Sequence, residues 1–148
     1  MGLDMYLTGK KYLYTDADML LAKNLQKELN TPFQVKEISC DFMYWRKANA
    51  IHAWFVKNCQ DNIDECQETY ITETSLLNLL NVCQEVLKSK TDEVSARLLP
   101  TQSGFFFGST DYNDYYYEDV ADTIEGLEKV LNFIGDSTSW SIYYRSSW

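Results

Sequence analysis

Alternation of apolar and polar residues predicts four β-strands along the chain. In the first of them Leu3, Met5 and Leu7 share one face, and the residues between them point to the other face. A strand this close to the start of the chain is expected to be held inside a sheet. These four strands cover residues 3 to 14, 33 to 44, 69 to 71 and 140 to 145, and a fifth strand is predicted at the three phenylalanines of residues 104 to 108.

Apolar residues in the intervening segments recur every three or four positions, which is the spacing of amphipathic helices. The first helix can be capped by Thr15 or Asp16, and its expected inward residues are Leu20, Leu21, Leu25 and Leu29. The predicted helices cover residues 16 to 29, 46 to 59, 73 to 88 and 113 to 131, with one further helical turn over residues 94 to 99.

This order of elements predicts an α+β fold in which a mixed or antiparallel sheet packs with about four helices. The chain has 148 residues, which is the size of one domain with a core of its own. No internal repeat, linker or low-complexity stretch interrupts it. We therefore predict a single domain over residues 1 to 148.

Three consecutive phenylalanines lie between two glycines in residues 104 to 108. This pattern is typical of a buried strand or hairpin arm whose ends need unusual backbone angles. The glycines also suggest a phosphate-binding loop, but the Lys followed by Ser or Thr of such loops is missing. The sequence therefore favours core packing for this segment.

The formal net charge is −9, which argues against direct binding to nucleic acid phosphates through a broad basic face. A basic protein partner is easier to reconcile with it. Residues 101 to 148 hold eight acids against Lys129 and Arg145, so this third of the chain carries a net charge of −6.

The sequence has no apolar run long enough to cross a membrane and no signal peptide, so we expect a cytoplasmic protein without a membrane partner. Its four cysteines form no CxxC pair, and His52 is the single histidine. We expect reduced thiols, no metal site and no cofactor.

Residues 44 to 55 contain two of the four tryptophans, the histidine and an Arg-Lys pair. On a helix over residues 46 to 59, Trp54 falls among the cations, on the side opposite the core. An indole ring in that position needs a second packing partner, which can be another helix or strand of the chain, a second subunit or a ligand. A homo-oligomer through Trp54 is therefore one of the alternatives.

Arg46 and Lys47 are expected at the start of this helix, where backbone N–H groups and the helix dipole attract anions. Neighbouring rings are suited to stacking on a base. The alternative is that these cations pair with acids of the chain itself, either those of residues 61 to 68 or those of the C-terminal helix. The candidate ligand-binding residues are Tyr44, Trp45, Arg46, Lys47, Asn49, His52 and Trp54.

His52 lies on the apolar side of the same helix, where a histidine is a base, a ligand contact or a hydrogen-bonded core residue. The core role is the commonest of the three. Asn49 lies one turn earlier, so the pair can bond to the backbone or hold a polar ligand. No motif supplies a nucleophile or partner for catalysis, so no catalytic residue is assigned.

An acidic stripe with interleaved tyrosines marks the helix over residues 113 to 131. Like charges at this spacing repel, so the stripe is either a solvated face, a docking surface for a basic protein, or an imitation of a nucleic acid backbone. The candidate partner-binding residues are Tyr112, Asp114, Tyr115, Glu118 and Asp122. Carboxylates along one helix face do not converge on a metal.

Four segments together resemble a family of small uncharacterised proteins encoded by tailed bacteriophages and prophages. They are MGLDMYL at the start, YWRKANAIHAWF at residues 44 to 55, GFFFGST at residues 104 to 110 and YYRSSW at the end. The resemblance spans most of the chain but implies no functional residue. It implies a setting in a host cell, where small phage proteins bind host components, including defence proteins and immune signalling nucleotides.

Three functions follow as hypotheses from these observations. The first is a non-enzymatic binding protein with a counter-defence role, which holds a small anionic, nucleotide-like ligand in an aromatic and basic pocket. The second is an acidic interaction module or DNA mimic that inhibits a basic host protein. The third is a nucleotide-processing enzyme.

Overall fold

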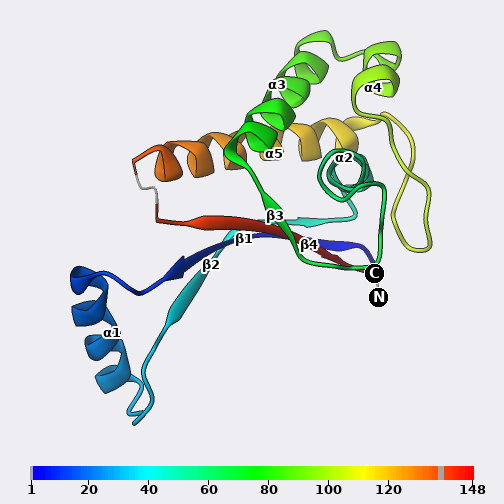
Figure 1. Ribbon diagram of the computed structural model, residues 1–148. Helices are drawn as coiled ribbons and strands as arrows, with labels where there is room; N and C mark the ends of the chain where they lie inside the picture. The colour runs from blue at the N-terminus through cyan, green and yellow to red at the C-terminus, as the bar shows by residue number, and fades with distance from the viewer. Residues whose placement is uncertain (1, 137–138) are drawn as a thin grey trace.

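A computed structural model of the protein describes residues 2–136 and 139–148 (Figure 1). The strands are β1 (Asp4–Tyr12), β2 (Glu37–Arg46), β3 (Thr69–Ile71) and β4 (Ser141–Ser147). The helices are α1 (Asp16–Glu28), α2 (Asn49–Cys59), α3 (Glu73–Ser89), α4 (Asp92–Leu98) and α5 (Asp114–Gly135). This arrangement confirms the predicted α+β class, and the helical turn expected near residue 94 is the short helix α4.

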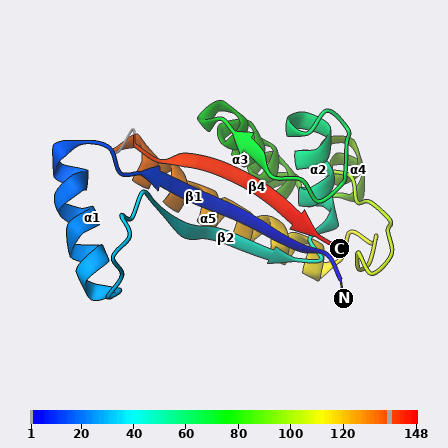
Figure 2. The same cartoon turned by 60° about the horizontal axis from the view of Figure 1, so that its bottom comes forward.

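The strands form one antiparallel sheet in the order β2-β1-β4-β3 (Figure 2). The sheet is therefore antiparallel and not mixed. Met5 lies opposite Trp45, and Leu7 lies opposite both Met43 and Tyr144. Because opposite residues in a ladder share a face, this register gathers the large apolar side chains on one side of the sheet.

That apolar side is covered by α2, α3 and α5, as Figure 1 shows. Leu3, Met5, Leu7 and Tyr144 are fully buried beneath these helices, which explains why the first strand is held in the middle of the sheet. Within the described residues, no helix lies over the opposite side. There Tyr6, Thr8 and Lys10 of β1 remain partly exposed, so each central strand has one dry and one wet side.

The helix α1 has the predicted extent, but the expectation that its leucines face the core is wrong. Figure 1 shows α1 projecting from one end of the sheet as a separate arm. Leu20 and Leu29 are 65% and 67% exposed, and Leu21 is also exposed. Its first turn is held by a capping box between Thr15 and Asp18 and by an ion pair of 3.0 Å between Lys11 and Asp18.

The expectation of a buried strand at the three phenylalanines is also wrong. Residues 104 to 108 form a loop, in which Phe105 and Phe106 are exposed and Phe107 alone enters the core. Phe106 has a positive φ of 62°, and the N–H of Phe107 donates to the carbonyl of Gly104. This tight reversal breaks the alternation that a strand requires.

The boundary between β2 and α2 differs from the prediction in a way that matters for the site. Arg46 ends the strand, Lys47 turns the chain with a φ of 58°, and α2 begins at Asn49. The expectation that the two cations begin the helix is therefore wrong. The N–H of Lys47 donates to the carbonyl of Leu3, so the turn continues the pairing with β1.

Trp54 is buried, so the expectation that it stands on an exposed face among cations is wrong. Seven of the eleven residues of α2 are buried, because this helix lies between the sheet on one side and α3 and the 99 to 110 segment on the other. The indole of Trp54 therefore packs against other elements of the same chain. Trp54 therefore offers no exposed surface for a homo-oligomer.

Among helices of residues 2–136 and 139–148, none combines the length and hydrophobicity that a bilayer-crossing segment requires.

Candidate functional site

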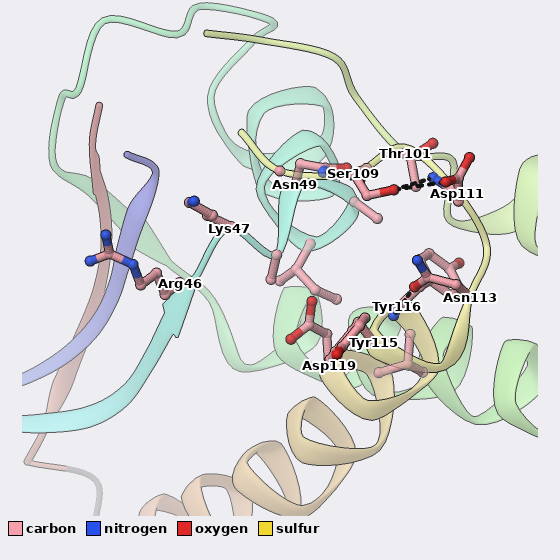
Figure 3. Close-up of a pocket in the computed structure, with 15 residues that line it drawn as sticks. Arg46, Lys47, Asn49, Thr101, Ser109, Asp111, Asn113, Tyr115, Tyr116 and Asp119 are labelled. Carbon is pink, nitrogen blue, oxygen red and sulfur yellow. Dashed lines mark hydrogen bonds between the residues drawn. The ribbon is translucent and has the colours of Figure 1, made fainter. Parts of the chain in front are cut away.

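A pocket of about 300 Å³ opens between the start of α2, the loop of residues 101 to 113 and the start of α5 (Figure 3). This volume lies at the lower end of the range for small-molecule sites. The pocket is lined by Arg46, Lys47, Ala48, Asn49, Ala50, Ile51, Thr101, Gly108, Ser109, Asp111, Asn113, Tyr115, Tyr116, Asp119 and Val120.

Asn49 builds one wall of this pocket by holding the loop against α2. Its buried amide nitrogen donates to the carbonyls of Phe107 and Ser109 at 3.1 and 2.9 Å, and its oxygen accepts from the N–H of Gln102 at 2.9 Å. Three of its four hydrogen-bonding positions are thus used by the backbone. Of the two roles that the sequence leaves open for Asn49, the structure shows the backbone role.

Gly108 allows the same loop to approach the turn before α2. It has a φ of +92°, and a side chain there would begin 3.2 Å from the Cβ of Lys47. A residue other than glycine would therefore be strained by its backbone and would press on the turn. The glycine of the GFFFG segment thus shapes the pocket, although the segment is not a strand.

The start of α2 supplies hydrogen-bond donors. Ala48 occupies the N-cap position and has no side-chain oxygen to accept from the first turn. In the described part of the chain, the N–H groups of Ala50 and Ile51 have no acceptor. Both residues line the pocket, so an uncapped helix start with its partial positive charge faces the cavity.

Asp119 on α5 faces this helix start across the pocket, and Figure 3 shows its carboxyl directed into the space. Within residues 2–136 and 139–148 it has no cation partner. Burial raises the pKa of Asp119 to about 6, with further contributions from Asp122 and Glu118. The group therefore changes between hydrogen-bond donor and anion close to neutral pH.

The two cations at the pocket edge are directed elsewhere. Arg46 forms an ion pair of 3.3 Å with Asp4, and in Figure 3 the charged ends of Arg46 and Lys47 point away from the cavity. Pairing with an acid of the same chain was the alternative interpretation of the two cations, and Arg46 does form such a pair, but with Asp4 and not with an acid of residues 61 to 68 or of the C-terminal helix. The charged groups beside the cavity are consequently Asp119 and, at the rim, Asp111, which accepts a hydrogen bond from Ser109.

His52 does not line the pocket and is fully buried. Its Nδ1 lies 2.8 Å from the hydroxyl of Tyr144, and its Nε2 lies 2.9 Å from the carboxylate of Asp64. Asp64 also accepts from the indole N–H of Trp148 at 3.0 Å. The histidine therefore joins α2, β4 and the loop after α2, and the role of a hydrogen-bonded core residue is the one that the structure shows.

The remaining aromatic candidates also lie away from the pocket. Tyr44 lies on the wet side of the sheet beside Tyr6 and donates to Asp4. Trp45 is buried and donates from its indole N–H to Thr123 at 2.8 Å. The rings that do line the cavity are Tyr115 and Tyr116. Of the seven candidate ligand-binding residues, Arg46, Lys47 and Asn49 are brought together here.

The candidate partner-binding residues share one exposed side of α5. Asp114, Tyr115, Glu118 and Asp122 are exposed, and Tyr112 is half-buried with its ring against Tyr116. None of the three acids forms an ion pair with another described residue. Tyr115 belongs both to this acidic face and to the pocket, so the two candidate sites adjoin.

Local sequence patterns did not point to four of the pocket residues, which are Asp119, Thr101, Asp111 and Asn113. For Asp119 a signal was present, because on a helix it lies between the acidic stripe and the inward stripe that contains Tyr117 and Val120. The three loop residues carry no such signal.

Asp119→Asn is expected to raise the free energy of unfolding by about 1 kcal/mol at pH 7.5. A carboxyl whose folded pKa is raised destabilises the fold above that pKa, and the penalty disappears below the unfolded value of 3.8. Water at the pocket mouth screens part of the effect. Urea unfolding from pH 4 to 7.5 tests this, with Asp136→Asn at the far end of α5 as the control. A stability gain that is the same at both pH values would contradict it.

Within the described ranges, no three His, Cys, Asp or Glu side chains gather closely enough to hold a metal ion. Comparison with protein-family models, with curated proteins and with solved structures found no match to this chain. The function is therefore inferred from the site itself.

Proposed function

We propose that this protein is a non-enzymatic binding protein for a small, nucleotide-like anion, held in the pocket between α2 and α5. The observation that carries the proposal is a cavity in which the uncapped start of α2 faces the unpaired carboxyl of Asp119. A pocket with donors on one wall and an acidic group on the other suits a ligand that has both acceptors and donors.

The two walls define how such a ligand binds. Its anionic group accepts from the N–H groups of Ala50 and Ile51, where the helix dipole favours negative charge. Its hydroxyl or amino groups face Asp119 and the polar side chains of Thr101 and Asn113. The exposed ring of Tyr115 is available for stacking at the rim. In this proposal the basic residues steer the ligand from outside the cavity and do not touch it.

Binding is proposed in preference to turnover because the histidine is sealed in the core, 2.8 Å from Tyr144, and cannot reach a ligand in the pocket. The resemblance to phage proteins supports a counter-defence role for the same activity, in which the protein removes a host signalling nucleotide from solution. A bound molecule stabilises the fold by an amount that grows with the logarithm of its concentration.

A thermal-shift and calorimetry panel of nucleoside monophosphates and cyclic mono- and dinucleotides tests the proposal. At least one cyclic nucleotide is expected to raise Tm, and to bind roughly fivefold more tightly at pH 5.5 than at pH 7.5, because its phosphodiester charge is constant while Asp119 becomes neutral. Asp119→Asn should remove this pH dependence, and Asp136→Asn should keep it. A panel without any binding, or an unchanged pH profile in Asp119→Asn, would overturn the proposal.

A second candidate function is an acidic module for a basic host protein, and one observation favours it. The negative charges of Glu118 and Asp122 help to raise the pKa of Asp119, so this stripe is a source of negative potential, and none of its acids forms an ion pair with another described residue. A host protein captured at low salt should be lost in Glu118→Lys/Asp122→Lys. Capture that survives this double reversal excludes the candidate.

A further inference from the structure

The arm formed by α1 lacks the packing that normally keeps a helix of 13 residues folded. Its buried residues are Asp18 and Ala22 alone, and it packs against no other helix of the described chain (Figure 1). Isolated helices of this length are marginal in water, and their stability comes from tertiary contacts. Phe33, which follows α1, is 77% exposed. The arm therefore presents an unpartnered surface.

The outer face of the arm combines apolar and basic side chains. Leu20, Lys23 and Lys27 follow one another at positions i, i+3 and i+7, which places them on one side of α1. All three are exposed, and neither lysine forms an ion pair with a described residue. A partner that matches this face has an apolar or aromatic contact followed by two acids at the same spacing.

The acidic face of α5 has that pattern. Tyr115, Glu118 and Asp122 are also exposed and also lie at positions i, i+3 and i+7. In both helices the first and third members lie about 10 Å apart along the axis. The two faces therefore match in spacing, in charge and in the position of their apolar residue.

The matching faces cannot meet within one molecule. Figures 1 and 2 show α5 above the helix-covered side of the sheet, whereas α1 projects from the end of the sheet away from that side. Charge is divided along the whole chain in the same way, with the bases concentrated around α1 and the acids elsewhere. Residues 4 to 47 hold seven bases and six acids, whereas the remaining residues hold six bases and sixteen acids. The region that contains α1 in one copy is therefore attracted to the acidic remainder of another copy.

We propose that α1 of one copy docks along the first half of α5 of a second copy, with the two helices running in the same direction. Leu20 then packs on Tyr115, Lys23 pairs with Glu118, and Lys27 pairs with Asp122. The partner of the acidic face is thus another molecule of this protein, and Tyr115 connects the interface to the rim of the pocket. The proposal does not depend on what the pocket binds.

Sedimentation at rising concentration and low salt tests the docking. The wild-type protein is expected to self-associate, and Lys23→Glu/Lys27→Glu and Glu118→Lys/Asp122→Lys are each expected to weaken self-association at least tenfold. A mixture of these two variants should associate again, because the reversed charges are complementary across copies. Lys57→Glu/Lys88→Glu, which changes the net charge as much as the first variant on exposed positions elsewhere, should associate like wild type.

Circular dichroism of each variant establishes that it is folded before its association is measured. A wild-type protein that remains a monomer throughout overturns the proposal, and so does a mixture of the two folded variants that fails to associate. Nucleotide binding is measured separately at concentrations where the protein is monomeric. Failure of the docking and failure of the pocket proposal are therefore distinguishable.

Discussion

His52→Ala is expected to lower the free energy of unfolding by about 3 to 4 kcal/mol, and Tm by roughly 10 °C. The side chain is fully buried, so its removal leaves a cavity. It also leaves the hydroxyl of Tyr144 without its partner at 2.8 Å and removes a hydrogen bond from Asp64. For a chain of this length, 1 kcal/mol corresponds to a few degrees in Tm.

Chemical and thermal denaturation measure this loss, and His52→Gln is the matched variant. Glutamine retains one donor and one acceptor in a side chain of similar reach, so it should recover part of the stability. Neither variant should abolish the proposed nucleotide binding at a temperature where it is folded, because His52 lies outside the pocket. A His52→Ala protein that keeps its stability but loses binding would refute the structural role.

Asn49→Ala is expected to cost about 2 to 3 kcal/mol and to loosen the loop of residues 101 to 113. The substitution leaves two carbonyls and the N–H of Gln102 without the partner that they have now. Unsatisfied backbone groups near the core cost more than the hydrogen bonds themselves contribute. Because this loop forms one wall of the pocket, ligand affinity should fall together with stability.

Hydrogen exchange of the loop amides is the direct measurement for Asn49. Protection of residues 101 to 110 should decrease in the variant while that of β1 and β4 stays close to wild type. Asn58→Ala is the control, since Asn58 is exposed and makes one hydrogen bond, to the carbonyl of Trp54. It should cost less than 1 kcal/mol. Unchanged exchange in the loop of Asn49→Ala would show that other contacts hold the wall.

The secondary structure could be predicted from the sequence wherever a periodic pattern faces a core. In α3, Leu76, Leu79 and Cys83 are buried as their spacing indicates, and the short strand at Thr69–Ile71 has the predicted bounds. The prediction that Leu20 and Leu29 face the core was wrong. Periodicity shows that a helix has an apolar side, but it does not show whether another part of the chain packs against that side.

The candidate site was predictable only where its residues are neighbours in sequence. Arg46, Lys47 and Asn49 share a turn that borders the pocket, and local composition pointed to them. The opposite wall comes from residues 101 to 120, more than fifty positions away, and no local pattern indicates that pairing. The direction of the charged end of Arg46 could not be predicted either. Asp4 attracts Arg46 because strand register places the two residues opposite each other, although they are far apart in sequence.

The two sides of the sheet place different constraints on change in the chain. A substitution at Met5 or Leu7 disturbs several helices at once, whereas the neighbouring Tyr6 and Thr8 reach water on the other side. Every second position of β1 can therefore vary in chemistry without altering the core that shapes the pocket. Surface properties of the protein can diverge among variants while the architecture around α2 and α5 stays fixed.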